Sequence, residues 1–412
     1  MNKAKSYEIS KHIVLEAFQR VKNNQGAPGV DNVSLEKFES NLKNNLYKIW
    51  NRMSSGSYVP PAVKAVEIPK KSGGTRILGV PTVADRVAQM VAKIYFEPKV
   101  EPYFHPDSYG YRPGKSAVDA LAVTRKRCWK YDWVLEFDIR GLFDNIDHGL
   151  LMKAVRRHTG NPWVILYIDR WLKAPMQMPD GTIVERTKGT PQGGIVSPVL
   201  ANLFLHYTFD KWMERHHSDK PFARYADDAI AHCHSKDSAM ELRCELEKRF
   251  MECGLELHPV KTRIVYCKDN NRKGNYSETA FDFLGYTFRP RRAKNHKGQP
   301  FISFIPGVSN QAKKAMRQTI RGWRVQLKSD KTLEDLSRMF NPVLRGWMGY
   351  YGRFYKSELY SVYRRMNQAL IKWAMRKYKR FRQRRKRARD WLGNVARREP
   401  SLFVHWEMGF LG

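Results

Sequence analysis

Apolar and polar residues alternate with two periods along this chain, and the periods separate helices from strands. Spacings of three and four residues between apolar positions predict helices, whereas alternation or short apolar runs predict strands. The predicted helices cover residues 8–50 (with a turn at 25–29), 81–101, 115–130, 147–158, 162–173, 197–215 and 236–253. The predicted strands lie within 59–76, 133–139, 183–190, 222–233, 262–267 and 281–288. This mixture indicates an α+β fold.

The pattern changes near residue 305, beyond which helical spacing dominates. We therefore predict three parts along the chain. Residues 1–60 are mainly helical, residues 61–305 mix helices and strands, and residues 306–412 are helical and rich in Arg, Lys, Trp and Tyr.

Two adjacent carboxylates, Asp227 and Asp228, interrupt an apolar run that otherwise has the composition of paired strands. Like charges side by side repel one another and lose hydration on burial, so an apolar strand is an unfavourable place for them. Mg²⁺ would relieve that penalty, because it binds carboxylate and phosphate oxygens. A polar turn between two strands is the more ordinary explanation of an Asp-Asp pair.

A third acid, Asp138, ends another apolar strand at 133–139. If the two strand ends meet, three carboxylates can hold two metal ions. One ion would activate a 3′-hydroxyl for attack and the other would stabilise a leaving pyrophosphate. The alternative for Asp138 is a cap on the turn that follows, although Asp144 and Asp147 are better placed for that role.

The composition favours a polyanionic partner. The 412 residues include 74 Lys and Arg against 40 Asp and Glu, a formal net charge of +34. With 42% hydrophobic residues the chain can bury a large core, so this charge lies on a folded surface and not in a disordered tail. Nucleic-acid phosphates are the obvious counterpart. A ribosomal or chromatin-type packing protein would share the charge but would need neither this length nor buried acids.

The cysteines and the N-terminal residues indicate the cellular compartment in which we expect the protein. Five cysteines, an odd number without Cys-x-x-Cys pairing, argue against a disulfide scaffold or structural zinc. We expect buried thiols in a reducing, bacterial-type cytoplasm. The first residues lack the apolar core of a signal peptide, and no run approaches about 18 apolar residues, so we expect no membrane association.

Three motifs resemble, in order and spacing, the palm motifs of reverse transcriptases. They are Phe-Asp-Ile-Arg-Gly-Leu-Phe at 137–143, Gly-Thr-Pro-Gln-Gly-Gly-Ile-Val-Ser-Pro at 189–198 and Tyr-Ala-Asp-Asp at 225–228. Segments similar to group II intron-encoded reverse transcriptases, or maturases, lie at 26–31, 76–81, 109–113, 255–262, 283–286 and, in the thumb or X domain, 345–351. The resemblance implies a right-hand polymerase. Residues 1–60 would form an N-terminal extension and the start of the fingers, 61–305 the fingers and palm, and 306–412 a helical thumb with a basic extension.

The resemblance also implies metal ligands and a gate. Asp138, Asp227 and Asp228 would bind two Mg²⁺ ions, with Mn²⁺ as a substitute, and the Ile139 carbonyl would complete the ligand shell. Phe143 matches an aromatic gate that clashes with a ribose 2′-hydroxyl and so favours dNTPs. A core aromatic is the commoner fate of a phenylalanine.

Other residues would bind the incoming dNTP. Lys70, or its neighbour Lys71, and Arg76 match fingertip residues that clamp the triphosphate, and arginine suits this role because its planar fork binds two phosphate oxygens. Gln192 would contact the nucleotide from a glycine-rich loop. Lys261 would assist the leaving pyrophosphate as a proton donor, or would be an ordinary surface lysine.

Charge and resemblance together imply a grip on a template–primer duplex and on structured RNA. Residues 376–389 hold ten basic residues and no acid, and their self-repulsion disfavours a helix unless a polyanion screens it. The interleaved aromatic residues either stack on bases or belong to the core. The predicted nucleic-acid contacts are Arg112, Tyr225, Arg345, Tyr350, Tyr351, Arg380, Arg384 and Arg385.

The implied activity is RNA-directed DNA polymerisation, with an RNA template, a DNA or RNA primer and dNTPs, joined to binding of a group II intron RNA that assists splicing and mobility. Many relatives carry a metal endonuclease after the thumb, and too few residues follow here, so we expect the short, endonuclease-lacking type. Two alternatives stay open. One is a domesticated reverse transcriptase in DNA repair or phage defence, and the other is a non-catalytic RNA-binding splicing factor, in which a carboxylate would be lost.

Overall fold

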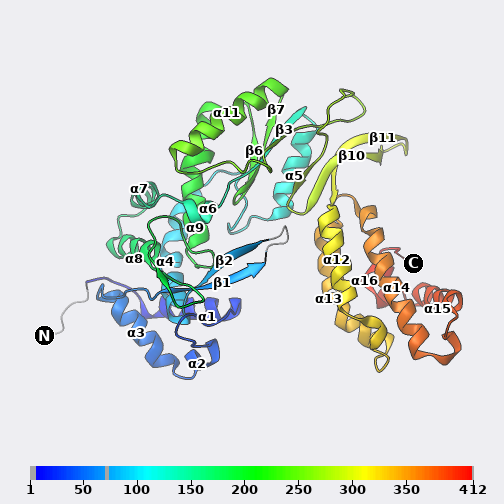
Figure 1. The fold of residues 1–412 in the computed structure, drawn as a ribbon, viewed down its shortest axis with the longest axis horizontal. Helices are drawn as coiled ribbons and strands as arrows, with labels where there is room; N and C mark the ends of the chain where they lie inside the picture. The colour runs from blue at the N-terminus through cyan, green and yellow to red at the C-terminus, as the bar shows by residue number, and fades with distance from the viewer. Residues whose placement is uncertain (1–5, 70–73, 411–412) are drawn as a thin grey trace. The chain divides into compact units, whose positions relative to one another are not determined.

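The computed structural model describes residues 6–69 and 74–410 and divides into two compact units (Figure 1). The first unit comprises Met1–Ala120 and Leu135–Arg263, and the second comprises Leu121–Val134 and Ile264–Gly412. Both units combine helices with strands, so the predicted α+β fold is confirmed. Among the described residues, no helix is long and apolar enough to cross a membrane.

The N-terminal helices of the first unit pack against one long buried helix, α4 (Val83–Val100). The predicted helical stretch 8–50 is three helices, α1 (Lys11–Asn24), α2 (Leu35–Glu39) and α3 (Leu42–Ser54). The loop between α1 and α2 lies tightly against the start of α4. A Cβ atom at Gly29 would stand 2.6 Å from the Thr82 backbone nitrogen, so only glycine fits there.

A four-stranded sheet with the order β2-β1-β4-β5 carries the basic hairpin. Its strands are β1 (Val63–Pro69), β2 (Thr75–Val80), β4 (Met176–Gln177) and β5 (Ile183–Val184). β1 and β2 are antiparallel, with Pro69 opposite Thr75, which confirms the predicted hairpin. The predicted strand 183–190 is wrong beyond Val184, because the chain leaves the sheet there and reaches Gly189 with a φ of 79°.

A second four-stranded sheet, with the order β6-β7-β3-β8, has helices over one face. Its strands are β3 (Trp133–Asp138), β6 (Phe222–Tyr225), β7 (Asp228–Cys233) and β8 (Arg263–Tyr266). The same unit contains α6 (Leu142–Asn145), α7 (His148–His158), α8 (Pro162–Lys173), α9 (Ser197–Leu205), α10 (Lys211–His216) and α11 (Lys236–Glu252), of which α11 packs against β7 and α8 against α4 and α7. Phe137 of β3 faces this helical layer, with its ring centroid 5.4 Å from that of Phe209 and 6.2 Å from that of Phe250. Since side chains alternate along a strand, Asp138 faces the opposite side.

The predicted helix 197–215 contains a π-helical turn at His206–Asp210, between α9 and α10. Such turns depart from regular helical hydrogen bonding, and here two carbonyls gain a side-chain partner. Arg249 donates to the carbonyl oxygens of Tyr207, at 3.3 Å, and Thr208, at 3.1 Å. The turn ends at Asp210, which is fully buried.

The second unit joins a hairpin sheet to a helical core. The sheet has the order β11-β10-β9, built from β9 (Phe281–Phe283), β10 (Tyr286–Lys294) and β11 (Pro300–Val308). The helices are α5 (Ala117–Cys128), which begins in the first unit, then α12 (Asn310–Gly322), α13 (Leu333–Tyr351), α14 (Tyr360–Lys377), α15 (Arg385–Arg398) and α16 (Val404–Glu407). Their core includes the buried rings of Tyr363, Trp373 and Trp406.

The long β10–β11 hairpin was not predicted, because its arginines and lysine break the apolar alternation. Glu358 binds this hairpin to the helices, since it accepts from Arg289 at 3.1 Å, from Lys313 at 2.5 Å and from Arg291. Burial would raise the pKa of Glu358, but the hydrogen bonds and charges of Lys313 and Arg291 outweigh burial and hold that pKa at about 2. The hairpin therefore belongs with the helices in one compact unit, and the predicted limits at 60/61 and 305/306 stay a prediction.

Candidate active site

Neighbouring strands of the β6-β7-β3-β8 sheet bring the three predicted carboxylates together. Asp138 ends β3, and Asp227 and Asp228 lie at the turn between β6 and β7. Because β7 lies beside β3 in the sheet, residues almost ninety positions apart in sequence become neighbours. Asp138 is 8% exposed, whereas Asp227 is half-buried and Asp228 is exposed.

The turn that carries the pair has an unusual backbone. Tyr225 pairs with Asp228 across the hairpin, so Ala226 and Asp227 are the two central turn residues. Ala226 has a φ of 58°, a conformation that two-residue hairpin turns demand at this position and that glycine usually supplies. An alanine there needs support from its surroundings.

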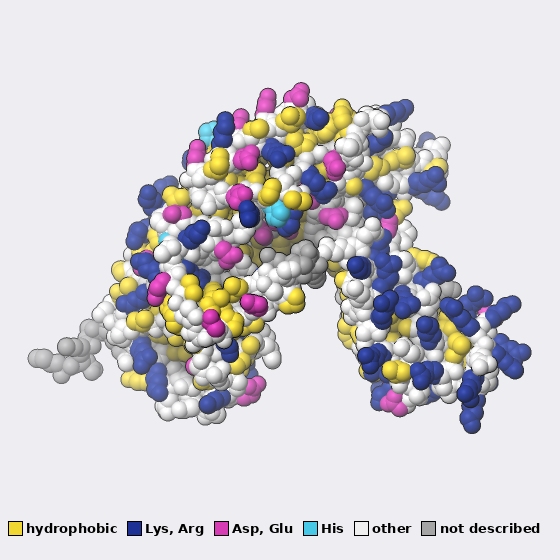
Figure 2. Space-filling view, viewed as in Figure 1, with side chains coloured by type: hydrophobic (Ala, Val, Ile, Leu, Met, Phe, Trp, Pro, Cys, Tyr) yellow, Lys and Arg dark blue, Asp and Glu magenta, His cyan; other side chains and the backbone are white. Residues whose placement is uncertain are grey.

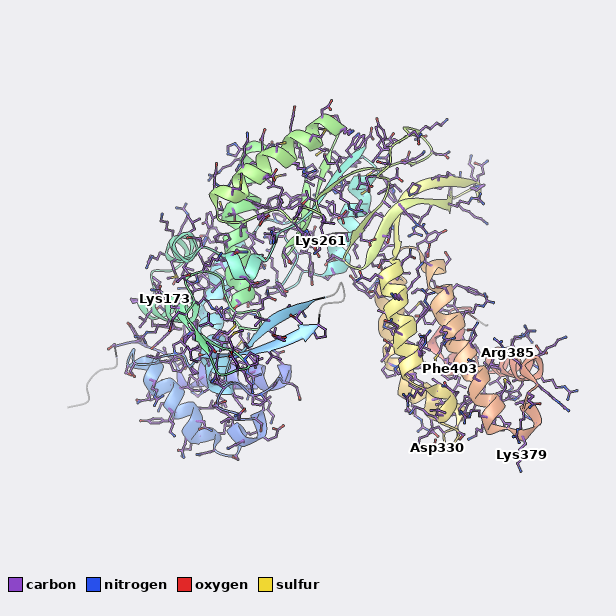
Figure 3. The ribbon with its side chains drawn as sticks, viewed as in Figure 1. Lys173, Lys261, Asp330, Lys379, Arg385 and Phe403 are labelled. Atoms are coloured by element: carbon purple, nitrogen blue, oxygen red, sulfur yellow. The ribbon has the colours of Figure 1, made fainter. Side chains whose placement is uncertain are left out.

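The carboxylates repel one another, and one lysine compensates in part. Burial, followed by the charge of Asp138, raises the pKa of Asp227. Burial and the charges of Asp227 and Asp138 raise the pKa of Asp228 to about 7. Because the side chain of Asp228 is exposed to solvent, we attribute the rise mainly to the two neighbouring negative charges. Lys261, labelled in Figure 3, donates to Asp138 Oδ2 at 2.7 Å. The site therefore has an excess of negative charge that a cation would stabilise.

A cavity of about 760 Å³ opens beside the carboxylates. Asp138 and Asp227 line it together with Ile139 and Lys261 from the predicted set. Arg76 of β2, Phe143 of α6 and Gln192 of the glycine-rich loop line it from the other elements. The structure thus gathers these predicted residues around one space, while Lys70 lies outside the described residues.

Hydrogen bonds hold the glycine-rich loop from both sides. Gly79 of β2 donates its backbone N–H to the Gln192 carbonyl at 2.7 Å, and Thr190 donates to the Phe143 carbonyl at 2.6 Å. Farther along, the side chain of Gln89 accepts from Ile195 at 2.7 Å and donates to Asp85 at 2.9 Å. The loop is therefore fixed to α4 as well as to the strand and helix that line the cavity.

The cavity also holds residues that the sequence reasoning missed. Arg186 and Asp144 line it, and the side-chain amide of Gln192 is 3.4 Å from Asp144 Oδ2. Tyr111 packs edge-on to Phe143, with ring centroids 6.5 Å apart. Burial, followed by the charge of Asp227, raises the pKa of Tyr111. The sequence pointed to Asp144 only as a cap and did not distinguish Arg186, whereas Tyr111 lies in the segment 109–113 that the resemblance had already marked.

Residues 68–288, more than half of the chain, match the family model described as reverse transcriptase (RNA-dependent DNA polymerase). The chain belongs to the reverse transcriptase family. Residues 313–391 match the group II intron, maturase-specific domain. Together the two matches confirm the predicted kinship with group II intron reverse transcriptases and their right-hand fold.

Individual relatives resemble part of this reverse transcriptase. Protein YkfC of Escherichia coli is 34% identical over 213 residues, which are 50% of this chain and 55% of YkfC. The group II intron-encoded protein LtrA of Lactococcus lactis is 34% identical over 203 residues, which are 48% of this chain and 33% of LtrA. A solved structure of telomerase from Candida albicans superposes with a TM-score of 0.46 and 11% identity, over 91% of this chain and 67% of that chain. The matched part thus spans about half of YkfC and a third of LtrA.

Reverse transcriptases use divalent metal ions, and the donors of this site fit such ions. Three carboxylates supply the hard oxygen ligands that Mg²⁺ and Mn²⁺ prefer, and the raised pKa values of Asp227 and Asp228 reflect charge that a cation would neutralise. As the side chains stand in the described part of the chain, no group of three or more His, Cys, Asp or Glu residues is placed to hold a metal ion. Lys261 occupies one oxygen of Asp138, so metal binding requires that ion pair to open.

The predicted nucleic-acid contacts divide into two groups in this reverse transcriptase. Arg112 has a side chain only 6% exposed, and its guanidinium donates to Glu101 and to the carbonyls of His105 and Ser108. The donors of Arg112 are therefore used inside the protein, and a nucleic-acid contact for this residue stays a prediction. Tyr225 is half-buried beside the turn between β6 and β7.

The two thumb tyrosines also have internal partners. Tyr350 donates its hydroxyl to the Leu284 carbonyl at 2.8 Å, and its own carbonyl accepts from Tyr286. The Tyr351 ring lies 5.6 Å from that of Tyr286 and against Gly285. These contacts fix the β9–β10 turn on α13, so the first role of both rings is packing.

The basic run of 376–389 forms an exposed surface. Arg380, Arg384 and Arg385 are exposed, as is Arg345 on α13. Lys377 alone among the basic residues of the run is half-buried, while Phe381 and Ala388 anchor the segment in the core. Figure 2 shows Lys and Arg side chains gathered over the C-terminal helices on the visible face, and Figure 3 shows Lys379 and Arg385 at the surface there.

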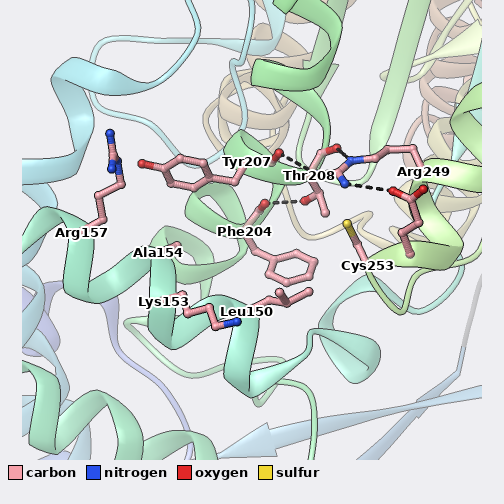
Figure 4. Close-up of a pocket in the computed structure, with 10 residues that line it drawn as sticks. Leu150, Lys153, Ala154, Arg157, Phe204, Tyr207, Thr208, Arg249 and Cys253 are labelled. Carbon is pink, nitrogen blue, oxygen red and sulfur yellow. Dashed lines mark hydrogen bonds and ion pairs between the residues drawn. The ribbon is translucent and has the colours of Figure 1, made fainter.

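A separate cavity of about 320 Å³ lies between α7, the π-helical turn and α11 (Figure 4). Leu150, Ala154, Phe204 and Cys253 supply apolar walls, and burial raises the pKa of the Cys253 thiol. None of the three carboxylates lines it. We assign this cavity no part in the chemistry of the site.

Proposed function

We propose that this chain is an RNA-directed DNA polymerase that adds dNTPs to a primer 3′-hydroxyl with two Mg²⁺ ions. The observation that carries the proposal is the meeting of Asp138, Asp227 and Asp228 beside one cavity. Arg76, Phe143 and Gln192 line the same cavity. Family membership supports the reaction class.

Each residue of the site has a role that follows from its position. The three carboxylates would hold the metal ions, which when bound activate the primer hydroxyl and stabilise the leaving pyrophosphate. Arg76, exposed at the cavity wall, would bind the triphosphate, and Gln192 would face the nucleotide from a loop fixed on two sides. Lys261, released from Asp138, would lie close enough to assist the departing pyrophosphate.

The second part of the proposal is RNA recognition. The match of residues 313–391 to the maturase-specific domain and the exposed basic run together support a group II intron RNA as the partner, with splicing and mobility as the outcome. A non-catalytic splicing factor is disfavoured because all three carboxylates are present and adjacent. We also propose that the protein works in a reducing, bacterial-type cytoplasm.

One assay tests the polymerase proposal, and RNA recovered with the protein tests the partner. Purified protein should extend a DNA primer on an RNA template with Mg²⁺ and dNTPs. Sequencing of RNA that co-purifies should recover one structured intron. Extension without an enriched intron would favour a domesticated reverse transcriptase, and enriched RNA without extension would favour a splicing factor.

Replacing Phe143 with alanine should weaken selection against ribonucleotides. The ring is half-buried at the cavity, and its removal opens space for a 2′-hydroxyl. We expect the ratio of kcat/KM for dNTP over rNTP to fall by at least about tenfold in single-nucleotide incorporation. Phe143→Tyr, which keeps a ring, should preserve the ratio. Unchanged discrimination by Phe143→Ala would reject the gate.

Neutralising Arg380, Arg384 and Arg385 with glutamine should weaken RNA binding most at low salt. Each lost phosphate contact reduces the slope of log K against log salt by about 0.7–0.9, so three contacts reduce it by about 2–3. Filter binding across a salt series measures the slope. The matched control replaces Lys236, Arg243 and Lys248, which are exposed on α11 among acidic residues. Equal slope changes in both triple variants would argue against a specific basic surface.

A further inference from the structure

A buried ion pair lies directly beneath the turn that carries Asp227 and Asp228. Arg224 and Asp210 are 1% and 0% exposed. Arg224 Nε donates to Asp210 Oδ1 at 2.8 Å and Nη2 donates to Oδ2 at 2.7 Å. Desolvation offsets most of the attraction in such a pair, and apolar residues of similar volume stabilise a fold as well. The other hydrogen bonds of the pair therefore indicate what it does.

All five N–H groups of the Arg224 guanidinium have an acceptor. Two of them bind Asp210. Of the remaining three, Nη1 donates to Asn202 Oδ1 at 3.1 Å and to the Ala226 carbonyl at 3.2 Å, and Nη2 donates to Ser108 Oγ at 2.8 Å. A planar fork is required to reach four residues in different directions, and the three donors of a lysine ammonium diverge from one atom.

These bonds converge on the strained part of the turn. Ala226, whose carbonyl Arg224 holds, is the residue with the φ of 58°. Asn202 links Arg224 to Gly110, because its side-chain oxygen accepts from Arg224 and its amide nitrogen donates to the Gly110 carbonyl at 2.7 Å. Gly110 lies against the turn so closely that a Cβ atom there would be 2.5 Å from the Ala226 nitrogen. The peptide that leads into Asp227 is thus held from below by Arg224 and from the side by Gly110.

We propose that Arg224, set by Asp210 and Asn202, is the positioning residue that fixes the Ala226 carbonyl and so the placement of the Asp227 and Asp228 carboxylates. Arg224 is buried, so it acts through the turn and not by contact with nucleotide or primer. The inference rests on the proposed function for its kinetic consequence. If Arg224 fixes the two carboxylates, its replacement should also weaken metal binding, and metal binding can be measured without catalytic turnover.

The test compares Arg224→Lys with a double variant, Asp210→Leu with Arg224→Met. The lysine keeps the charge and loses the fork. The double variant removes both charges and should keep the fold, because apolar replacement of a buried ion pair is tolerated. For both, we expect kcat for primer extension to fall by about tenfold to a hundredfold, and Mn²⁺ affinity, followed by the resonance of free Mn²⁺, to weaken by about tenfold. Template–primer affinity and the thermal midpoint of the double variant should stay near wild type.

Arg272→Lys is the matched control. Arg272 is also a largely buried arginine. It binds Asp269 through two nitrogens, and it donates to the Tyr131 carbonyl and, at 3.5 Å, to Asp132. None of these partners belongs to the turn of Asp227 and Asp228. The Arg272→Lys variant should keep wild-type kcat and Mn²⁺ affinity. The proposal is overturned if the folded double variant has wild-type Mn²⁺ affinity and kcat, or if losses in all three variants track the folded fraction. If the wild-type protein does not polymerise, the proposed function fails, and the Mn²⁺ comparison alone decides the positioning role.

Discussion

Replacing Asp227 and Asp228 with asparagine should abolish primer extension, with a loss of at least about a thousandfold in rate. Asparagine keeps the size of aspartate but removes two of the three charges that would hold the metal ions. Primer extension on an RNA template measures the loss. Binding of the template–primer should stay within about twofold of wild type, since the exposed basic surface lies elsewhere on the chain.

The fold should survive this change. The raised pKa values of Asp227 and Asp228 mean that their charges destabilise the metal-free protein, so the variant should be no less heat-stable than wild type in the presence of a chelator. Asp219→Asn, an exposed acid of the same unit paired with Lys220, is the control and should remain active. dNTP incorporation by the folded double variant would refute the assignment of the metal ligands.

Asp85→Ala should produce the largest loss of stability among the changes considered. The carboxylate is 1% exposed and accepts from Tyr58 and Trp171, each at 2.8 Å, and from Gln89 at 2.9 Å. Burial raises its pKa, and these three hydrogen bonds oppose that rise. Alanine leaves three buried donors without an acceptor, so we expect a loss of about 3–5 kcal/mol in the unfolding of the first unit. Urea unfolding followed by tryptophan fluorescence measures it.

The control for this change is Asp169→Ala, which removes an acid that pairs with Lys173 on the exposed face of α8. An exposed pair contributes about 0–1 kcal/mol, so this variant should unfold close to wild type. Asp85→Ala should also slow primer extension at temperatures where it is folded, because Gln89 would lose the partner that holds it against the loop of Gln192. Equal urea midpoints for the two variants would contradict the buried network.

The sequence identified the candidate metal ligands, but it did not identify the buried residues that hold them in place. Asp138, Asp227 and Asp228 were identified because charges that end apolar strands conflict with their neighbours, and the sheet order then explains their meeting. Asp85, Asp210 and Arg224 give no such signal. Their importance depends on which distant residues pack around them, and a single sequence does not show that.

The same reason explains two structural features that the sequence did not reveal. The side chain of Arg112, a predicted nucleic-acid contact, donates to Glu101 and to the carbonyls of His105 and Ser108. The β10–β11 hairpin was missed because its apolar face is interrupted by arginines, one of which, Arg291, is buried with Glu358. In both places the sequence suggests a solvent-exposed arginine, whereas in the structure a glutamate pairs with that arginine inside the fold.

The most direct test of the central claim is extension of a labelled DNA primer on an RNA template by the purified protein, with dNTPs and Mg²⁺. The account predicts template-directed products that a chelator abolishes, that excess Mg²⁺ restores, and that the Asp227→Asn, Asp228→Asn variant does not form. A folded wild-type protein that binds the template–primer but adds no nucleotide with Mg²⁺ or Mn²⁺ would contradict it.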